Sequence, residues 1–149
     1  MKDIPRSALI LGFAGLIPFL WGAATVVSPG LFDFALANVG PRFMGVYVLN
    51  FYGTIILAFM SGILWGFATK AEGARASIVY ALSVIPALWA FFMVGGGAET
   101  SIIALIAGYG GLLLLDGFYW RIGLAPSWWM ALRIPLTVIV AACLCVPLL

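Results

Sequence analysis

Residues 44–68 read MGVYVLNFYGTIILAFMSGILWGFA and contain no charged side chain. A helix needs roughly 20 apolar residues to cross the hydrocarbon core of a bilayer, and this stretch is long enough. A helix that is apolar on all sides has no polar face for water and belongs in a protein core or a membrane. The stretch therefore predicts a transmembrane helix.

Four more apolar stretches, bounded by charges, Pro or Gly, extend this prediction to five spans. They cover residues 7–27, 77–94, 101–119 and 130–149. The last is short, because Arg133 needs a membrane interface and leaves only residues 134–149 as purely apolar length. The predicted fold is all-α, a polytopic bundle of five transmembrane helices that forms a single domain over residues 1–149.

The first span resembles a secretory signal, because Lys2 and Arg6 precede an apolar run. That run is longer than the apolar core of about 7 to 15 residues in a typical signal. A charged loop of the kind expected after cleavage is also missing from the sequence that follows. We therefore expect this segment to be retained as a transmembrane helix.

The composition supports a membrane protein and disfavours several function classes. The 149 residues are 65% apolar and only 8% charged, whereas a soluble domain carries about 25% charged residues. The net charge is only +2, with no basic tail, so nucleic acid is not an expected partner. The chain has no histidine, which is the commonest metal ligand and general base. We expect a non-catalytic protein without a cofactor.

The two cysteines, Cys143 and Cys145, do not change that expectation. They are two residues apart on the last predicted helix, so their side chains diverge by about 200°. A copper site of the Cys-x-Cys type would also need a histidine or a nearby methionine. We interpret both residues as small buried hydrophobic side chains and expect no metal site.

The basic residues of the connections predict the orientation. With five spans, one side of the membrane receives six of the seven Lys and Arg residues and the other side receives only Arg42. The six are Lys2, Arg6, Lys70, Arg75, Arg121 and Arg133. Positive residues in short loops favour the cytoplasmic side. The amino terminus should therefore be cytoplasmic and the carboxyl terminus periplasmic.

The longest connection, residues 28–43, contains a segment, residues 31–36, that is apolar apart from Asp33 and is bracketed by Pro29-Gly30 and Gly40-Pro41. Such a segment is typical of a short helix that lies in the membrane interface. It either seals the end of the bundle or covers a pocket, and sealing is the commoner role.

Small residues recur on one face of two predicted helices. They are Ala8, Gly12, Gly15 and Gly22 in the first span and Ala104, Gly108 and Gly111 in the fourth. Small side chains let two helix backbones approach closely, which is a main route to helix association in lipid. We interpret both faces as helix-packing surfaces. Pro18 should also kink the first helix near the middle of the membrane.

Polar side chains form a stripe on the second predicted helix. At 100° per residue they fall within an arc of roughly 60°. The members are Tyr47, Asn50, Thr54, Ser61 and Trp65. Polar groups in hydrocarbon need partners, so the stripe should face the bundle interior. It either joins helices by hydrogen bonds or lines a cavity for an amphiphile such as a quinone or a lipid head.

Asp116 is the only acidic residue inside a predicted span. An ionisable residue within the membrane is a functional candidate whose partner has to be found. Arg133 should lie at the same membrane level, so a structural ion pair is the favoured interpretation. A proton relay is the alternative, although a single carboxylate without histidine makes a poor chain of proton carriers.

Tryptophans gather near the predicted span ends, as in the aromatic belts of membrane proteins. The residues near span ends are Trp21, Trp120, Trp128 and Trp129. Trp65 and Trp89 are candidates for packing or for stacking on a ligand.

Several of these motifs together resemble the domain of unknown function 3429 family of small inner-membrane proteins. The similar elements include Ile4-Pro5, Ala8, Leu11-Gly12, Gly15-Leu16, Pro18-Phe19, Tyr52-Gly53, Phe59, Gly62, Trp65-Gly66, Ser83-Val84, Pro86, Leu88, Asp116, Trp128, Arg133, Leu136 and Thr137. The chain departs from the family pattern at Leu64 and Phe91, where a polar residue and a tryptophan are common. The resemblance implies a bacterial inner membrane or a mitochondrial location, and it implies no particular chemistry.

Three functions remain open on the sequence. The favoured one is an accessory or assembly subunit of a larger membrane complex, respiratory or photosynthetic, because the loops are short and the small-residue faces extensive. The alternative is a binding protein for a hydrophobic ligand such as quinone, porphyrin or lipid. A proton-coupled transporter that uses Asp116 ranks third. In each case the lipid bilayer is a partner.

The charge distribution gives a topology test. A reporter that is active only in the periplasm should be active when fused after Leu149, and it should be silent when inserted in the loop between Lys70 and Arg75. The reverse pattern of reporter activity would contradict the predicted orientation.

Overall fold

The computed structural model describes residues 4–149, which form helices joined by short connections and contain no strand. The α-helices are α1 (Arg6–Ala14), α2 (Ile17–Val27), α3 (Pro29–Asn38), α4 (Gly45–Ala68), α5 (Ala74–Met93), α6 (Ala98–Arg121) and α7 (Trp129–Cys145). Two 3₁₀ turns, η1 (Pro41–Phe43) and η2 (Val146–Leu148), complete the list. Lys2, which belongs to the predicted charge distribution, lies outside the described residues.

Five helical segments among the described residues are long and apolar enough to cross a membrane, which confirms the predicted fold class. They are Arg6–Val27, Gly45–Ala68, Ala74–Met93, Ala98–Arg121 and Trp129–Leu148. The prediction missed the first turn of α5 and of α6 and the last two residues of α6, because polar residues such as Arg75 and Glu99 still belong to those helices. Helix ends need only reach the interface, where charged side chains are tolerated.

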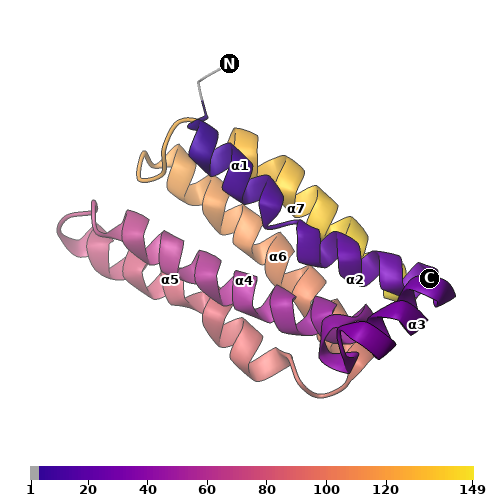
Figure 1. Ribbon diagram of the computed structural model, residues 1–149. Helices are drawn as coiled ribbons and strands as arrows, with labels where there is room; N and C mark the ends of the chain where they lie inside the picture. Colours follow the sequence, from indigo (N-terminus) through magenta and orange to yellow (C-terminus); the bar gives the residue numbers. More distant parts are fainter. Residues whose placement is uncertain (1–3) are drawn as a thin grey trace.

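The five spans form a ring in which each packs on its neighbours. The order around the ring is α2, α4, α5, α6 and α7, and α7 returns to α2. Helices α4 and α6 also contact each other across the middle. Figure 1 shows the long helices running side by side, with the connections α4–α5 and α6–α7 at one end and α3 with the carboxyl terminus at the other. We call the end with the α4–α5 and α6–α7 connections the basic end, because Lys70, Arg75 and Arg121 lie there.

The first span is broken into α1 and α2 near its centre. Helix α1 ends at Ala14 and α2 begins at Ile17. The Leu16 amide donates to the Phe13 carbonyl, a tighter turn than the α-helical pattern allows. The break lies just before Pro18, whose ring excludes the carbonyl four residues earlier. The predicted kink is thus present, as an interruption of the helix.

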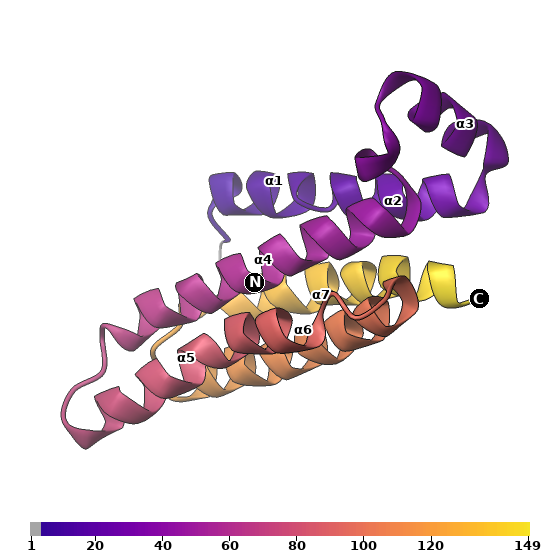
Figure 2. The same ribbon diagram turned by 90° about the horizontal axis from the view of Figure 1, so that it is seen from below.

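Helix α3 occupies the residues for which a short interfacial helix is predicted, and Figure 2 shows it beyond the end of α2. The Ser28 hydroxyl accepts the Leu31 amide at the start of α3. Two contacts then fix the chain that leads into α4. The Trp21 indole donates to the Phe43 carbonyl over 2.7 Å, and the Gly45 amide donates to the Thr25 hydroxyl over 2.8 Å.

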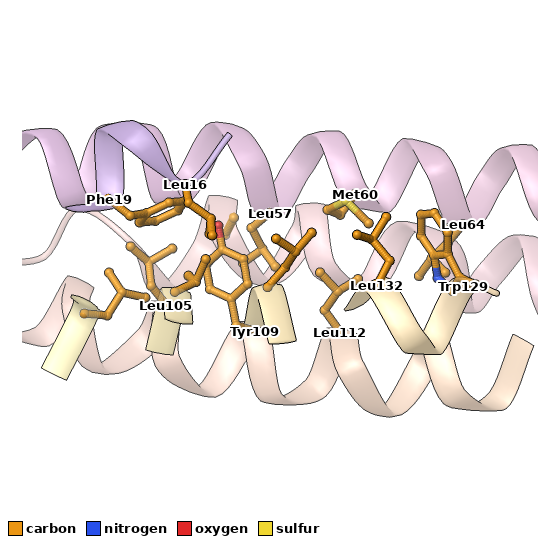
Figure 3. Close-up of a cluster of buried hydrophobic side chains, with 14 of the residues drawn as sticks. Leu16, Phe19, Leu57, Met60, Leu64, Leu105, Tyr109, Leu112, Trp129 and Leu132 are labelled. Atoms are coloured by element: carbon orange, nitrogen blue, oxygen red, sulfur yellow. The ribbon is translucent and has the colours of Figure 1, made fainter. Parts of the chain in front are cut away.

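The core is a column of buried apolar side chains along the axis of the ring. Leu57 and Leu64 of α4 face Leu105 and Leu112 of α6, and all four are fully buried. Figure 3 shows Tyr109 within this column and Trp129 at one end of it. The faces outside the column are apolar as well, so the protein contacts the lipid bilayer around its perimeter.

Buried and half-buried side chains connect neighbouring helices by donating hydrogen bonds to backbone carbonyls. The Tyr109 hydroxyl of α6 donates to Gly53 of α4 over 2.8 Å. The Trp89 indole of α5 donates to Ala104 of α6 over 2.7 Å, and the Tyr119 hydroxyl of α6 donates to Val79 of α5. A polar side chain in hydrocarbon has to find its partner inside the protein, so these bonds fix how the helices are rotated.

Ser61 of α4 forms hydrogen bonds with backbone groups of α5 on either side of Pro86. Proline lacks an amide hydrogen and disturbs the helical ladder around it. The Ser61 hydroxyl donates to the Ser83 carbonyl and accepts the Ala87 amide at 3.4 Å, so it inserts between two groups of α5. A serine from a neighbouring helix is a known way to satisfy backbone groups at a proline within a membrane. This polar residue of the predicted stripe therefore has a structural role.

The predicted glycine faces are only partly packing surfaces. A Cβ atom at Gly22 or Gly108 would lie under 3.0 Å from neighbouring side chains, and one at Gly12 would lie 3.1 Å from Leu136. Gly15 instead lies at the break between α1 and α2. Gly111 was predicted to pack, but nothing described lies within 4 Å of its Cβ position. The reason is that α6 turns Gly108 towards α4 and α5 and leaves Gly111 at the surface.

We expect Gly108→Ala to destabilise the fold by about 1 to 3 kcal/mol through overpacking. The added methyl would meet Leu57 at 2.7 Å and Trp89 at 2.9 Å, and Trp89 is held by its bond to Ala104. Gly111→Ala is the matched control and should be neutral or stabilising by up to about 1 kcal/mol, because alanine favours helix. Thermal unfolding of the purified protein by circular dichroism measures both, and equal effects would refute the packing argument.

Candidate functional site

Asp116 lies at the centre of a buried polar cluster between α6 and α7. Its side chain is fully buried, and each carboxylate oxygen has a partner. Oδ2 accepts the Nε–H of Arg133 over 2.8 Å, and Oδ1 accepts the indole N–H of Trp129 over 2.8 Å. The structure thus brings together the two residues, Asp116 and Arg133, that the sequence singled out as partners.

The local sequence explains why both donors reach one carboxylate. Trp129 and Arg133 are four residues apart on α7 and therefore share a face. The chain turns between α6 and α7 at Gly123, whose φ of 80° belongs to the left-handed region. The Leu124 and Ala125 amides then both donate to the Tyr119 carbonyl. This compact turn brings the first turns of α7 against the last turns of α6.

Two basic residues, Lys70 in the α4–α5 connection and Arg75 in the first turn of α5, tie the loops of the basic end together. The Lys70 ammonium donates to the Leu124 carbonyl over 3.1 Å, and the Arg75 guanidinium donates to the Ile122 carbonyl over 3.0 Å. Cationic side chains favour the carboxyl ends of helices, where carbonyls lack partners. The charges that predict orientation therefore also hold the end of α6 in place.

Trp129 corrects the prediction that four tryptophans form an aromatic belt. It is 8% exposed, packs edge-on against Phe67 and donates to Asp116. Trp120, by contrast, is 42% exposed and donates to Ser127 in the adjoining loop. Trp120 and Trp129 lie at the same end of the bundle, and the rotation of α7 about its axis turns Trp129 towards the interior. The sequence signal for the inward position of Trp129 is its spacing of four residues from Arg133, which places both side chains on one face of the helix.

The polar stripe of α4 does not face the interior as a whole, which is a second correction. Tyr47 is 68% exposed, and Trp65 is 49% exposed and packs on Tyr80. The stripe is centred roughly a quarter turn away from the buried face of α4. It therefore runs along the edge that meets α5, and only its middle residues are covered.

Part of the stripe lines a cavity, which we call the Asn50 cavity. Its volume is about 530 Å³, and it is lined by Tyr47, Asn50, Phe51, Thr54, Ile55, Val94, Gly95, Gly97, Ala98 and Ser101. It lies away from the basic end, between the first turns of α4 and the α5–α6 connection. The Asn50 amide donates to the Ala98 carbonyl over 3.1 Å, and the Thr54 hydroxyl donates to the Asn50 carbonyl over 2.7 Å.

The other candidate residues separate in space. Both cysteines are free thiols, and Cys143 is buried as expected, whereas Cys145 is exposed, so the expectation of a buried side chain is wrong for Cys145. Within residues 4–149 the structure shows no group of three or more Asp, Glu or Cys residues that could hold a metal ion. Trp89 packs against Gly108 and uses its indole N–H within the bundle.

Five apolar spans around a buried ion pair define a multi-pass integral membrane protein. A family model described as "Protein of unknown function (DUF3429)" matches residues 4–149, and the chain belongs to that family. The comparison confirms the resemblance drawn from the sequence motifs.

Curated relatives carry the name transmembrane protein 69. The chain is 32% identical to the protein of Xenopus tropicalis over 145 residues, which are 93% of this chain and 52% of the relative. It is 29% identical to the protein of Mus musculus over 143 residues, 93% of this chain and 54% of the relative. The chain therefore spans about half the length of these relatives. No solved structure matches it.

The ion pair gives a double-mutant prediction. Asp116→Asn or Arg133→Gln should each destabilise the protein by about 3 kcal/mol or more, because either change leaves a buried charge without its partner. The double variant should lose less than the sum of the two single losses. Thermal unfolding of the four proteins measures the coupling, and additive losses would show that the pair is not energetically linked.

The indole bond can be tested separately in the same assay. Trp129→Phe removes one donor to a carboxylate, which should cost about 1.5 to 3 kcal/mol. Trp120→Phe makes the same chemical change at an exposed indole and should cost no more than about 0.5 kcal/mol.

Proposed function

We propose that this protein is a non-catalytic integral membrane protein that binds an amphiphilic ligand in the Asn50 cavity. The observation that carries the proposal is a cavity of about 530 Å³ whose lining includes a buried amide oxygen without a partner. Ligand pockets typically measure about 300 to 1,000 Å³ and combine apolar walls with a few polar groups. The Asn50 cavity has both properties.

The unpaired amide oxygen of Asn50 indicates which polar group the ligand carries. Asn50 uses its N–H to bond the Ala98 carbonyl, and this bond leaves Oδ1 as the unused acceptor. Among residues 4–149, Oδ1 is buried and has no donor partner. An acceptor calls for a ligand with an O–H or N–H group. A lipid whose head carries a hydroxyl group therefore fits better than an oxidised quinone, which has no donor.

The walls and the surroundings favour a ligand that comes from the membrane. Phe51, Ile55 and Val94 supply apolar surface beside the polar groups, and Phe51 and Ile55 are also exposed on the outside of α4. A lipid could place its acyl chains along these side chains and its head against Asn50 and Thr54. We propose the bacterial cytoplasmic membrane as the location, with the mitochondrial inner membrane as the alternative.

A second candidate function, an accessory or assembly subunit of a larger respiratory or photosynthetic complex, is supported by an exposed face of α4. Ala58, Gly62 and Gly66 lie four residues apart, and all three are exposed. Nothing in the described part of the chain lies within 4 Å of a Cβ at either glycine. Small residues at this spacing form close contacts between transmembrane helices. The face would suit a helix of another protein.

Proton-coupled transport is supported less well. Both oxygens of Asp116 are engaged by Arg133 and Trp129, and the residue is fully buried. A carboxylate whose two oxygens are both engaged in this way has a structural role, because loss of its charge would leave the buried guanidinium without a counter-charge.

Lipid analysis of the purified protein tests the main proposal. After gentle extraction, the wild type should retain a hydroxyl-bearing lipid at a stoichiometric level by mass spectrometry. Asn50→Leu should lose most of it, because the acceptor is gone. Asn38→Leu is the matched control and should retain the lipid, since Asn38 is exposed on α3 and its amide bonds only its own helix.

A second variant protects the test against misfolding. Ala98→Phe fills the cavity but keeps the carbonyl that Asn50 bonds, and it should also lose the lipid. Retention of the same lipid by Asn50→Leu and Ala98→Phe would refute the proposal. A stoichiometric partner protein in place of a lipid would favour the accessory role.

A further inference from the structure

A second cavity lies at the break of the first span, against the face of α7 that carries Arg133. Its volume is about 130 Å³, and α1, α2, α4, α6 and α7 all contribute to its lining. The polar side chains in the lining are Arg133, Thr137 and Tyr109. We call it the Arg133 cavity. It shares no lining residue with the Asn50 cavity.

Two hydrogen-bond donors of this cavity are buried without partners. Arg133 binds Asp116 through Nε, whereas its Nη2 atom has no acceptor among residues 4–149. The Thr137 hydroxyl likewise bonds no described group. Both residues are 6% exposed, and they lie four positions apart on one face of α7. Two donors with unused hydrogens, one helical turn apart on α7, suit one oxygen acceptor placed between them.

The charge balance indicates a neutral acceptor. The positive charge of Arg133 is already compensated by Asp116 at 2.8 Å. An anion in the cavity would add an unbalanced buried charge, which is costly in a medium of low dielectric constant. A carbonyl oxygen accepts two hydrogen bonds and brings no charge. The guanidinium and the hydroxyl therefore favour a carbonyl over a phosphate or a carboxylate.

The size and walls of the cavity indicate a ring. A cavity of about 150 Å³ in another protein holds one benzene molecule, so about 130 Å³ is close to the space of a single six-membered ring. Phe19 and Tyr109 lie edge-on to each other, with ring centres 6.1 Å apart, and both line the cavity. Apart from the donors on α7, the walls are mainly apolar side chains such as Leu136 and Val140.

The cavity reaches the surface that contacts lipid. Leu11 and Phe59 belong to its lining, and they are 71% and 62% exposed on α1 and α4. Helix α1 has no buried residue, and the break at Gly15 separates it from α2. A ligand could therefore place its ring inside and extend a chain outward between Leu11 and Phe59 into the bilayer.

We propose that the Arg133 cavity binds the ring of a lipid-soluble quinone. One carbonyl oxygen of the ring accepts hydrogen bonds from Arg133 Nη2 and Thr137 Oγ1, and the tail leaves between Leu11 and Phe59. The proposal is independent of the Asn50 cavity, where the buried atom without a partner is an acceptor. No electron transfer is involved, since binding alone satisfies the two donors.

Titration of the purified protein in phosphatidylcholine nanodiscs with decylplastoquinone, whose ring carries two methyl groups and no bulky methoxy group, tests this proposal. The wild type should bind one molecule per chain in a saturable way, detected by native mass spectrometry and by a rise in thermal stability. Thr137→Val should weaken binding about 3- to 10-fold, the range that corresponds to one lost hydrogen bond. Without quinone, Thr137→Val should be as stable as the wild type or more stable, because an unpaired buried hydroxyl is removed.

Two controls distinguish quinone binding in the Arg133 cavity from binding in the Asn50 cavity and from purely apolar partitioning. Thr54→Val makes the same change in the Asn50 cavity and should leave quinone affinity unchanged. Decylbenzene, which has the ring and tail without a carbonyl, should bind at least 10-fold more weakly than decylplastoquinone. Tighter binding of decyl phosphate, equal binding of decylbenzene, unchanged affinity of Thr137→Val or a lack of saturable quinone binding would each overturn the proposal.

Discussion

The fold depends on one constraint, that polar groups inside a bilayer find their partners within the protein. Its strongest expression is the carboxylate of Asp116, which holds Arg133 and Trp129 at 2.8 Å each. An unpaired charge at this depth would be costly, so α6 and α7 are held in one relative rotation. The same constraint governs the bonds from Tyr109, Trp89 and Ser61 to backbone carbonyls of neighbouring helices.

These bonds also explain why a ring of five spans can be stable with a modest apolar core. In lipid, burying a leucine between helices gains little over leaving it against an acyl chain, so packing and hydrogen bonds decide association. Gly53 and Gly108 admit close neighbours, namely Leu105 at 3.0 Å and Leu57 at 2.7 Å from their Cβ positions. The glycines let neighbouring helices approach closely, and the hydrogen-bond donors fix how the helices are rotated.

The two cavities have complementary polarity. The Asn50 cavity presents an amide oxygen that needs a donor, and the Arg133 cavity presents donors that need an acceptor. A structural polar network would be expected to satisfy its own members. The atoms left over at these two positions therefore distinguish the proposed binding sites from the rest of the bundle, where polar side chains serve to join helices.

The sequence alone determined the five spans, the pairing candidates Asp116 and Arg133, and the family, because length, hydropathy and isolated charges are properties of the chain itself. It did not determine rotation about each helix axis. The tertiary structure alone turned Trp129 inward, left Tyr47 and Gly111 at the surface, and placed Ser61 at Pro86. A helix that is apolar on all sides has no polar face from which its outward side could be recognised in the sequence. Its rotation about its axis therefore follows from contacts with neighbouring helices, which only the assembled bundle supplies.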